Sequence, residues 1–480
     1  MNTQIVKLFG LVLALYALLL GFTSYWSVFD AQGLIENPDN KRPLLVEQTI
    51  KRGDIKTIDG TLIARSTPVG RGNNQIYVRH YPQGELFGNP VGYSFVERGR
   101  VGIELSHNDE LVGNKTEFLS ILDELQGYEQ EGSNLITSLD AEAQRVALEG
   151  LAGQPGSVVA IAPDTGEVRA MVSVPPYDPN QIPNDAEFKR LTAADPPELI
   201  NRATQSVYPP GSTMKVVTAT AALESGEFEP GSTLSGATGQ ECGGVPLSNA
   251  GGESFGTIDM EVGLVNSVNT YWCQVGEALG NDTMFDYMDR FGFNRRPDID
   301  YPSFQLAPSG VYESGDLLGE NAAIDIGRVA IGQERLLVTP LQMAEVAATV
   351  ANDGERMCPR LWSRVVDPDG RVDKLEPERC AQVMSEDTAN TLSEFMTKVV
   401  EEGTGTSAQL TVTDVAGKTG TAEIEGREGC AAPNQAWFIG FAPVEDPEIA
   451  VAATVECTSG YGGDTAGPIA SQVMESLLGG

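Results

Sequence analysis

Histidine is almost absent from this chain, and its scarcity removes several common kinds of active site. Only His80 and His107 occur among the 480 residues, and both lie in the N-terminal quarter. A Ser-His-Asp hydrolase needs a histidine base beside its serine. The chain also has no C-x-x-C pair that would suit a zinc site. We therefore expect neither histidine-based hydrolysis nor a bound metal.

Phosphate-binding loops and basic clusters are missing as well. No G-x-x-x-x-G-K-[ST] motif occurs, and no G-x-G-x-x-G follows a predicted strand. Lys and Arg number 32 against 67 Asp and Glu, which gives a net charge of −35. Such a surface repels a phosphate backbone, so we expect no nucleic-acid partner. The acidity fits a solvated surface, with an acidic docking face as the alternative.

Long apolar runs are absent except for one, Leu8 to Phe29, which contains no charged side chain. A helix of this length crosses a hydrocarbon core of about 30 Å. Lys7 precedes the run and Asp30 follows it, which favours a cytoplasmic N-terminus. A cleaved signal peptide is the alternative, but the run is long and no A-x-A site follows. We predict that residues 1–29 form a cytoplasmic stub and a single-pass signal anchor in the cell membrane, with the rest on the extracytoplasmic face.

The six cysteines all follow this apolar run, which suits an oxidising compartment. Six thiols allow 15 pairings, so composition alone does not choose between them. Two predicted hairpins would bring Cys358 to Cys380 and Cys430 to Cys457, which leaves Cys242 with Cys273 by elimination. Buried reduced thiols are the alternative.

The pattern of turns changes once along the chain. Up to about Gly153 short extended runs alternate with turns, and Arg52-Gly53-Asp54 fits such a turn better than an adhesion motif. From Gly156 two apolar runs surround a Pro-Asp-Thr-Gly turn, helical patterns follow to about Asn352, and strands then return. Strands at both ends of a helical middle predict an α+β domain whose first and last strands share one sheet.

The segment "PPGSTMKVVTA" places Ser212 three residues before Lys215 at the head of a helical pattern. That spacing puts both side chains on one face of a helix. A lysine whose pKa is lowered by burial or by a neighbouring cation can take the proton from a serine hydroxyl. Backbone N–H groups of the first turn can also stabilise a developing oxyanion. The alternative is an ordinary helix cap beside a solvated lysine.

Two further motifs follow in a fixed order. Ser267 and Asn269 form an S-x-N at the start of a helical stretch, and Lys418-Thr419-Gly420 is the only K-T-G, on a predicted strand. A second S-x-N at Ser106–Asn108 shows that this pattern alone is common. The ordered set S-x-x-K, S-x-N and K-T-G is the motif set of serine β-lactamases and penicillin-binding proteins.

These motifs and several longer segments resemble class B penicillin-binding proteins, which are peptidoglycan D,D-transpeptidases, and in particular the actinobacterial penicillin-binding protein A group. The resemblance covers nearly the whole chain. It rests on "RGDIKTIDGTLIA", "GRVGIELS", "NRATQSVYPPGSTMK", "IGQERLLVTPLQMAEVAATVANDGE", "VVEEGTGTSA" and "AWFIGFAP". One departure is Glu334, where the family usually has glycine, which leaves the shape of that loop open.

The resemblance implies an α+β architecture. Residues 154–480 would form a penicillin-binding transpeptidase domain, similar to serine β-lactamases, with a central antiparallel sheet flanked by helices and an all-helical subdomain. Residues 30–153 would form a β-rich pedestal for interactions. No cofactor is implied. The expected partners are peptidoglycan stem peptides, β-lactam antibiotics, a membrane glycosyltransferase and divisome or elongasome proteins.

The resemblance also assigns roles. Ser212 would attack the D-Ala-D-Ala carbonyl, and Lys215 would remove its proton. Ser267 would pass a proton to the leaving amine, Asn269 would hold the substrate amide and Lys215, and Lys418 would present a positive charge to these groups.

The remaining positions bind the substrate. Thr419, Gly420 and Thr421 would line the strand beside it, and the backbone N–H groups of Ser212 and Thr421 would form the oxyanion hole. A D,D-carboxypeptidase, a β-lactamase or β-lactam sensor, and a non-catalytic envelope scaffold remain alternatives. For a β-lactamase, Glu313 and Glu320 lie in the right interval, but neither is in an E-x-x-L-N pattern.

Overall fold

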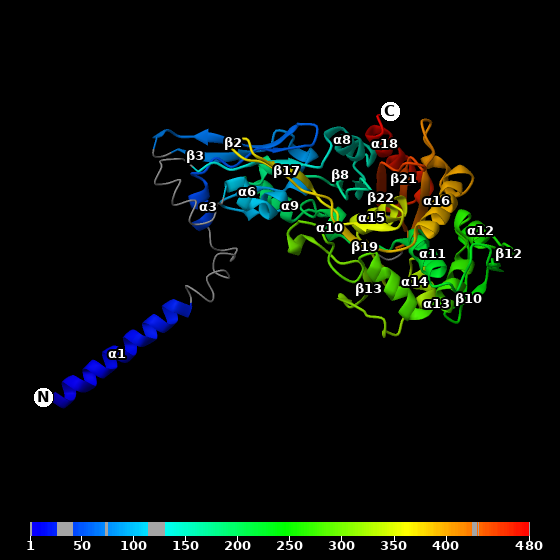
Figure 1. Cartoon of the computed structure of the whole chain (residues 1–480), viewed down its shortest axis with the longest axis horizontal. Coiled ribbons are helices and arrows are strands. Elements are labelled where there is room, and N and C mark those ends of the chain that lie inside the picture. The colour runs from blue at the N-terminus through cyan, green and yellow to red at the C-terminus, as the bar shows by residue number, and fades with distance from the viewer. Residues whose placement is uncertain are drawn as a thin grey trace.

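The computed structural model describes residues 2–25, 42–72, 75–113, 130–424, 430 and 432–479. It begins with a helix, α1 (Asn2–Ser24), whose described side chains are all exposed (Figure 1). The part Thr3–Ser24 is long and apolar enough to cross a membrane. An apolar helix with no protein packed against it suits a hydrocarbon environment. Residues 26–29 of the predicted span lie outside the described residues.

A six-stranded sheet in the order β18-β17-β6-β1-β2-β3 is built mainly from the N-terminal region, and we call it the pedestal sheet. Its strands are β1 (Ile55–Lys56), β2 (Leu62–Val69), β3 (Ile76–His80), β6 (Asn134–Thr137), β17 (Trp362–Val366) and β18 (Val372–Lys374). The hairpin β17–β18 comes from late in the chain, where the sequence placed it in the catalytic domain, and it joins this sheet through β6 (Figure 1). The predicted β-rich character is confirmed, while a division at residue 153 stays a prediction.

A buried ion cluster holds the pedestal together. Arg52 donates to the Glu104 carboxylate at 2.8 Å and Arg79 donates to it at 2.5 Å, and all three residues are less than a tenth exposed. Burial alone would raise the pKa of Glu104, but the two arginine charges outweigh it and lower the pKa to about 2. Because Arg52 is buried in this cluster, the adhesion interpretation of Arg52-Gly53-Asp54 is wrong.

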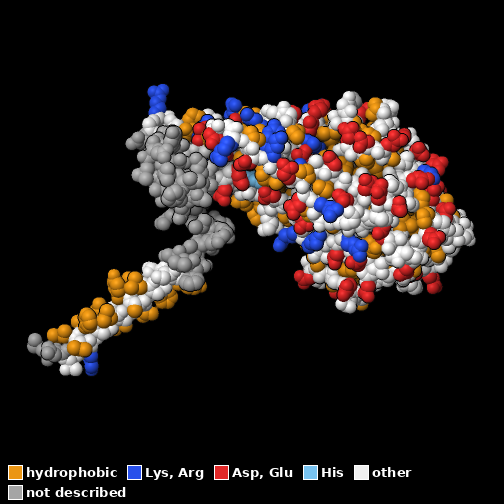
Figure 2. Space-filling model, in the orientation of Figure 1, with side chains coloured by type: hydrophobic (Ala, Val, Ile, Leu, Met, Phe, Trp, Pro, Cys, Tyr) orange, Lys and Arg blue, Asp and Glu red, His pale blue; other side chains and the backbone are white. Residues whose placement is uncertain are grey.

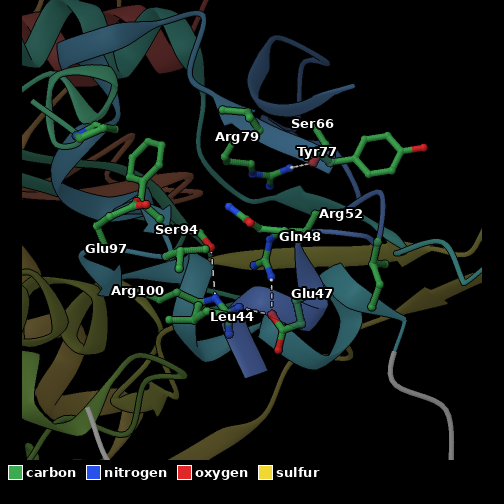
Figure 3. Close-up of a pocket in the computed structure, with 15 residues that line it drawn as sticks. Leu44, Glu47, Gln48, Arg52, Ser66, Tyr77, Arg79, Ser94, Glu97 and Arg100 are labelled. Carbon is green, nitrogen blue, oxygen red and sulfur yellow. Dashed lines mark hydrogen bonds and ion pairs between the residues drawn. The ribbon is translucent and has the colours of Figure 1, made fainter. Parts of the chain in front are cut away.

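Beside this cluster lies a cavity of about 230 Å³. Figure 3 shows Arg52, Arg79 and Arg100 around it, with Arg52 pointing to Glu47 at 3.5 Å. Arg100 also pairs with Glu47. The cavity therefore has three guanidinium groups in its lining, two of which share one carboxylate at its wall.

The larger, C-terminal part of the structure is built on a five-stranded antiparallel sheet in the order β20-β21-β22-β7-β8. Its strands are β7 (Gly156–Ile161), β8 (Val168–Val174), β20 (Ala416–Glu423), β21 (Asn434–Ala442) and β22 (Ile449–Thr458). The first strands thus pair with the last, as predicted, through β7 and β22. Nearly every residue of β7, β21 and β22 is buried, because helices cover both faces. Strand β20 lies at one edge, and this edge faces the candidate site.

Helices divide between the two faces of this sheet. One face packs on α8 (Ala141–Gly150) and α18 (Gly467–Leu477). The other packs on a mainly helical lobe, which also carries the short ribbon β10–β11 (Gln240–Cys242 and Val245–Leu247). The helices of this lobe include α11 (Lys215–Glu224), α12 (Met260–Val265), α13 (Asn269–Arg290), α14 (Ile326–Ala330), α15 (Pro340–Ala351) and α16 (Glu386–Glu401). Acidic side chains are spread over the visible face of both parts (Figure 2).

All three predicted disulfides are present: Cys242–Cys273, Cys358–Cys380 and Cys430–Cys457. Val366 pairs with Val372 across the turn at Asp369, which brings Cys358 and Cys380 together as the hairpin pattern indicated. The alternative of reduced thiols is wrong, since no described cysteine is free.

Replacing Glu104 by glutamine tests the buried cluster. Arg52 and Arg79 would lose their shared counter-charge, and breaking a buried ion pair on one side costs about 3–5 kcal/mol of unfolding free energy. Because the folded-state pKa is depressed, the stabilisation is present above about pH 4.5 and is lost as pH falls toward 2. Urea unfolding of the full-length protein at pH 7 and pH 3, followed by tryptophan fluorescence, measures both effects.

The matched control is Glu131→Gln. Glu131 pairs with Lys51 at 2.5 Å, but both side chains are about half exposed, so the loss should stay below about 1 kcal/mol. Equal losses for the two variants would show that the buried cluster contributes no more than a surface pair.

Candidate active site

Ser212 lies on a sharp turn at the head of helix α11. The 3-10 turn η5 (Gly211–Met214) carries it, and neither η5 nor α11 has a side-chain cap. Its hydroxyl has no hydrogen-bond partner among the described residues, and Lys215 is completely buried. The alternative of a helix cap beside a solvated lysine is therefore wrong.

Gly211 brings this turn against strand β20. Its φ of 54° lies in the left-handed region, and its N–H donates to the Gly332 carbonyl at 3.0 Å. A Cβ atom on Gly211 would lie 2.7 Å from the Thr421 carbonyl oxygen. Only glycine fits here, so the residue before Ser212 touches the backbone of Thr421 directly.

Lys215 reaches across to the S-x-N motif. Its Nζ lies 2.8 Å from the Ser267 carbonyl oxygen, 2.7 Å from Asn269 Oδ1 and 3.2 Å from Ser267 Oγ. The structure therefore brings two of the three predicted motifs into direct contact, over a separation of more than fifty residues.

Lys418 approaches the same hydroxyl from strand β20. Its Nζ lies 3.0 Å from Ser267 Oγ and 3.2 Å from the Thr419 carbonyl oxygen, and the side chain is completely buried. The Ser267 hydroxyl thus lies between two buried lysines, and all three motifs meet at this one oxygen.

The surroundings of the two lysines disfavour their charged forms. Burial lowers the pKa of Lys215 well below its usual value, and the charge of Lys418 lowers it further. Burial lowers the pKa of Lys418 to about 7. A neutral Lys215 amine has two hydrogens, for the Ser267 carbonyl and Asn269 Oδ1, and a lone pair for a hydroxyl. A charged Lys418 amine has three hydrogens, so a third remains available for an anionic substrate group. The geometry therefore fits one shared proton, held by Lys418.

The backbone at Ser267 is strained where the residue contacts Lys215. Ser267 has a φ of 54°, which is uncommon outside glycine, at the junction of α12 and α13. This conformation lets both its carbonyl and its hydroxyl face Lys215.

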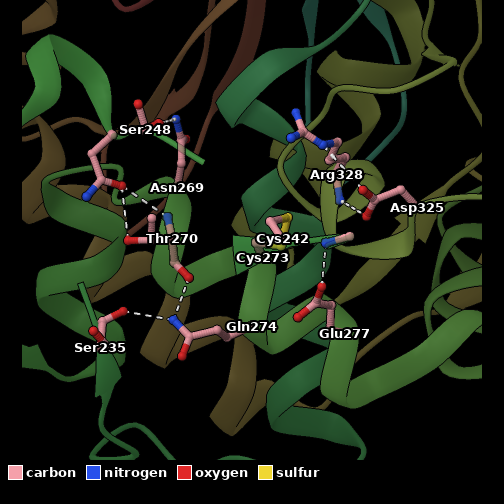
Figure 4. The surroundings of a disulfide bond; sticks show 12 residues. Ser235, Cys242, Ser248, Asn269, Thr270, Cys273, Gln274, Glu277, Asp325 and Arg328 are labelled. Atoms are coloured by element: carbon pink, nitrogen blue, oxygen red, sulfur yellow. Dashed lines mark hydrogen bonds and ion pairs between the residues drawn. A yellow bond between two sulfur atoms is a disulfide. The ribbon is translucent and has the colours of Figure 1, made fainter. Parts of the chain in front are cut away.

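Asn269 begins α13, and its amide donates to the Ser248 carbonyl at 3.2 Å (Figure 4). One turn further on, the Cys242–Cys273 disulfide ties α13 to the β10–β11 ribbon that leads to Ser248. A covalent bond therefore links the two sides of the Asn269 contact. The sulfur atoms and Glu277 lie within 4.8 Å of one another, but both sulfurs are in the disulfide and are not available as thiolate ligands for a metal.

The K-T-G strand is held by residues that the sequence did not single out. Thr419 Oγ1 shares a hydrogen bond of 2.7 Å with Thr404 Oγ1, and Gly462 N–H donates to Thr421 Oγ1 at 3.0 Å. A Cβ atom on Gly462 would lie 2.2 Å from the Gly420 carbonyl oxygen. The paired glycines of "GYGGD" were the available signal for this close approach.

Two other sequence expectations have plain outcomes. Glu334 has a φ of 64°, so the loop keeps a glycine-like conformation despite the substitution, at a cost of about 1 kcal/mol. The second S-x-N lies in the pedestal, where Asn108 accepts a hydrogen bond from Arg52 at 2.7 Å.

Comparison with known proteins gives a consistent result. Residues 156–475 match the penicillin binding protein transpeptidase domain, and residues 52–135 match the penicillin binding protein A dimerisation domain. The chain is 33% identical over its whole length to the peptidoglycan D,D-transpeptidase PbpA of Mycolicibacterium smegmatis, of which it covers 99%.

Solved structures agree with this. The ceftriaxone acyl-enzyme complex of penicillin-binding protein A from M. tuberculosis has a TM-score of 0.80 and 30% identity, covering 90% of this chain and all of that one. The D,D-transpeptidase domain of a peptidoglycan glycosyltransferase from Eggerthella lenta has a TM-score of 0.76 and 30% identity, over 90% of this chain and 99% of that one.

The electrostatic arrangement predicts a specific pH dependence. Acylation of Ser212 by penicillin G should slow as the pH falls and Lys215 becomes protonated. Lys418→Met removes the positive charge beside Lys215, so the pKa of Lys215 should rise and the acid limb of the profile should move to higher pH. Stopped-flow acylation rates between pH 5 and 9 measure the shift.

Lys398→Met is the control, because Lys398 on helix α16 pairs with Glu261 on α12 and with Glu394 on its own helix, and it is not among the groups that shift the pKa of Lys215. Its profile should match that of the unmodified protein. An acid limb that stays in place in Lys418→Met would rule out this coupling between the two lysines.

Proposed function

This chain belongs to the penicillin-binding protein transpeptidase family, as its motifs indicated, and we propose how its own residues carry out the family's reaction. The protein is a serine-type peptidoglycan D,D-transpeptidase with an N-terminal apolar helix suited to membrane anchoring. One observation carries the assignment of roles: the Ser267 hydroxyl lies between the buried amines of Lys215 and Lys418, and Lys215 lies one helical turn after Ser212.

Acylation begins at Ser212. Neutral Lys215 takes the hydroxyl proton while the oxygen attacks the carbonyl of the penultimate D-alanine of a stem peptide. The backbone N–H groups of Ser212 and Thr421 receive the oxyanion. Support for this pair comes from Gly211, whose contact with Thr421 holds the two backbone segments side by side.

Breakdown of the tetrahedral intermediate needs a proton on the leaving amine. Ser267 Oγ supplies it and is reprotonated from the Lys215 side, to which it is already hydrogen bonded. The terminal D-alanine then leaves, and Ser212 carries an ester. The amine of a second stem peptide attacks this ester, loses its proton back to the same groups and forms the cross-link. Asn269 holds Lys215 during these steps.

The substrate lies along strand β20. An edge strand offers unpaired N–H and C=O groups to an extended peptide. Lys418 holds the carboxylate end with its charge, and the Thr419 and Thr421 hydroxyls add hydrogen bonds to it. Gly420 keeps the strand close to the serine turn, since a Cβ atom there would lie 2.6 Å from the Pro210 carbonyl oxygen.

The N-terminal region, residues 30–153, serves as a pedestal that places the catalytic domain away from the membrane, on the extracytoplasmic face. We assign to it the docking of a membrane glycosyltransferase and of divisome or elongasome proteins, because cross-linking acts on newly made glycan strands. The arginine-lined cavity beside Glu47 gives this region a recess for a partner's side chain.

The alternatives lack a comparable observation. A class A β-lactamase needs a glutamate between S-x-N and K-T-G that activates water at the acylated serine. Glu313 is exposed and pairs with Arg335 at 2.5 Å, and Glu320 is exposed as well. Neither contacts the serine and lysine cluster, so rapid deacylation has no support among the described residues.

Fluorescent penicillin tests the nucleophile. The full-length protein should form a covalent adduct that maps to the peptide containing Ser212, and Ser212→Ala should reduce labelling by at least about 10³-fold. Ser225→Ala, at the other end of the same helix, should label normally. An adduct on another residue would contradict the assignment.

A second assay separates transpeptidation from hydrolysis. With a stem-peptide thioester donor and a D-amino acid acceptor, the protein should yield the aminolysis product in preference to free acid. If free acid is the main product at every acceptor concentration, the protein is instead a carboxypeptidase.

A further inference from the structure

A buried carboxylate on strand β22 holds the segment that leads to Ser212. We propose that Glu456 is a positioning residue, which fixes the Ser212 turn relative to the strand that supplies the oxyanion N–H. This inference rests on the proposed function of Ser212. Glu456 does not touch the serine and acts through Tyr208 and Arg202.

The contacts of Glu456 are short and enclosed. Its Oε1 accepts a hydrogen bond from Tyr208 OH at 2.6 Å and another from Arg202 Nε at 2.8 Å. Tyr208 is completely buried, and Arg202 and Glu456 are less than a tenth exposed. Arg202 is held in turn by the Pro197 carbonyl at 2.8 Å and by Ser173, which accepts its backbone N–H. The carboxylate is therefore the centre of a buried hydrogen-bond network.

Tyr208 passes this restraint to the serine turn. Its backbone forms two hydrogen bonds with Val338, at 2.9 and 2.8 Å, and its ring packs edge-on against Trp437 at 6.1 Å. The indole N–H of Trp437 then donates to the Pro209 carbonyl at 3.0 Å. Gly211 is hydrogen-bonded to Gly332, and the Pro210 carbonyl accepts from Thr213 Oγ1 at 2.8 Å, so every residue from 208 to 211 is tied by a hydrogen bond. Ser212 follows directly.

The position of Glu456 in the sheet explains why the network matters for catalysis. Thr421 pairs with Ala436, and Ala436 pairs with Val455, the neighbour of Glu456. Glu456 therefore lies one residue beyond the cross-strand row that contains Thr421, two strands away from β20. Movement of Glu456 relative to Tyr208 would shift Ser212 relative to Thr421, and the two oxyanion N–H groups come from these two elements.

The positioning role depends on the charge of the Glu456 carboxylate, and a neutral group of the same shape does not suffice. Burial and the nearby Glu456 charge raise the pKa of Tyr208, so its hydroxyl remains a proton donor. Arg202 also only donates. Both donors meet one oxygen, and the amide oxygen of a glutamine could accept the same two hydrogen bonds, so the difference lies in the charge. A glutamine would leave Arg202 buried without a counter-charge.

The test is the acylation kinetics of Glu456→Gln in the full-length protein. Misplacement of a reacting group by about 1 Å costs about 10²-fold in rate, so we expect the first-order acylation rate constant to fall about 10- to 100-fold. The apparent dissociation constant of the non-covalent penicillin complex should stay within about twofold, because the binding groups on β20 are untouched. Tyr208→Phe, which removes only the hydroxyl, should give a smaller fall of the same kind.

Glu345→Gln provides the matched control. Glu345 is also a buried acidic side chain facing a buried arginine, with Arg356 at 3.5 Å, and burial raises the pKa of Glu345 to about 7. It lies against Ile161, which pairs with Ala450 at the opposite end of β22. This variant should change thermal stability and leave the acylation rate constant within about twofold.

The outcomes are distinct. If the unmodified protein forms no adduct at Ser212, the proposed function fails, and positioning is not at issue. If the unmodified protein reacts but Glu456→Gln reacts equally fast, the positioning role is wrong. Equal slowing in Glu456→Gln and Glu345→Gln, in proportion to the folded fraction measured by circular dichroism, would also overturn it, because it would show a general loss of stability.

Discussion

The site depends on one hydroxyl between two buried amines. Lys215 and Lys418 both lie within hydrogen-bonding distance of Ser267 Oγ. Because both amines are buried and repel each other, they do not remain charged together. In the proposed mechanism the neutral amine lets Lys215 act as a base, and the charge on Lys418 attracts an anionic substrate end. The two proposed roles, a base and a binding group for the substrate anion, therefore follow from the same repulsion between buried amines. The proposed steps use neither a histidine nor a metal.

The fold holds the two lysines and Ser267 close together. Ser267 holds a left-handed backbone, and the Cys242–Cys273 disulfide ties the helix after it to the ribbon beside Asn269. On the other side, Gly211 and Gly420 let the serine turn press against the edge strand. The strain and the missing side chains cost stability locally. The buried five-stranded sheet, which joins the first and last strands of the domain, is rigid enough to carry that cost.

The sequence allowed much of this to be predicted, because several signals are local. The ordered motifs identified Ser212, Lys215 and Lys418, and turn residues at the centre of a hairpin identified the Cys358–Cys380 disulfide. The hairpin's own destination was missed: β17 adds to the pedestal sheet, because strand pairing depends on free edges in space and leaves no mark in the strand's own residues. Glu334 is a case in which the local residue type did not indicate the backbone conformation, since a glycine-like backbone occurs there without glycine.

By itself the sequence determined which groups are available for chemistry: the scarcity of histidine left lysine as the base, and the apolar run gave a helix that can span a membrane. Only the tertiary structure decided how these groups act. The lowered lysine pKa values come from burial and from approach across more than two hundred residues, and the roles of Glu456, Tyr208 and Gly462 come from contacts between distant segments. Charge and burial depend on the full surroundings of a side chain, and those exist only once the chain is folded.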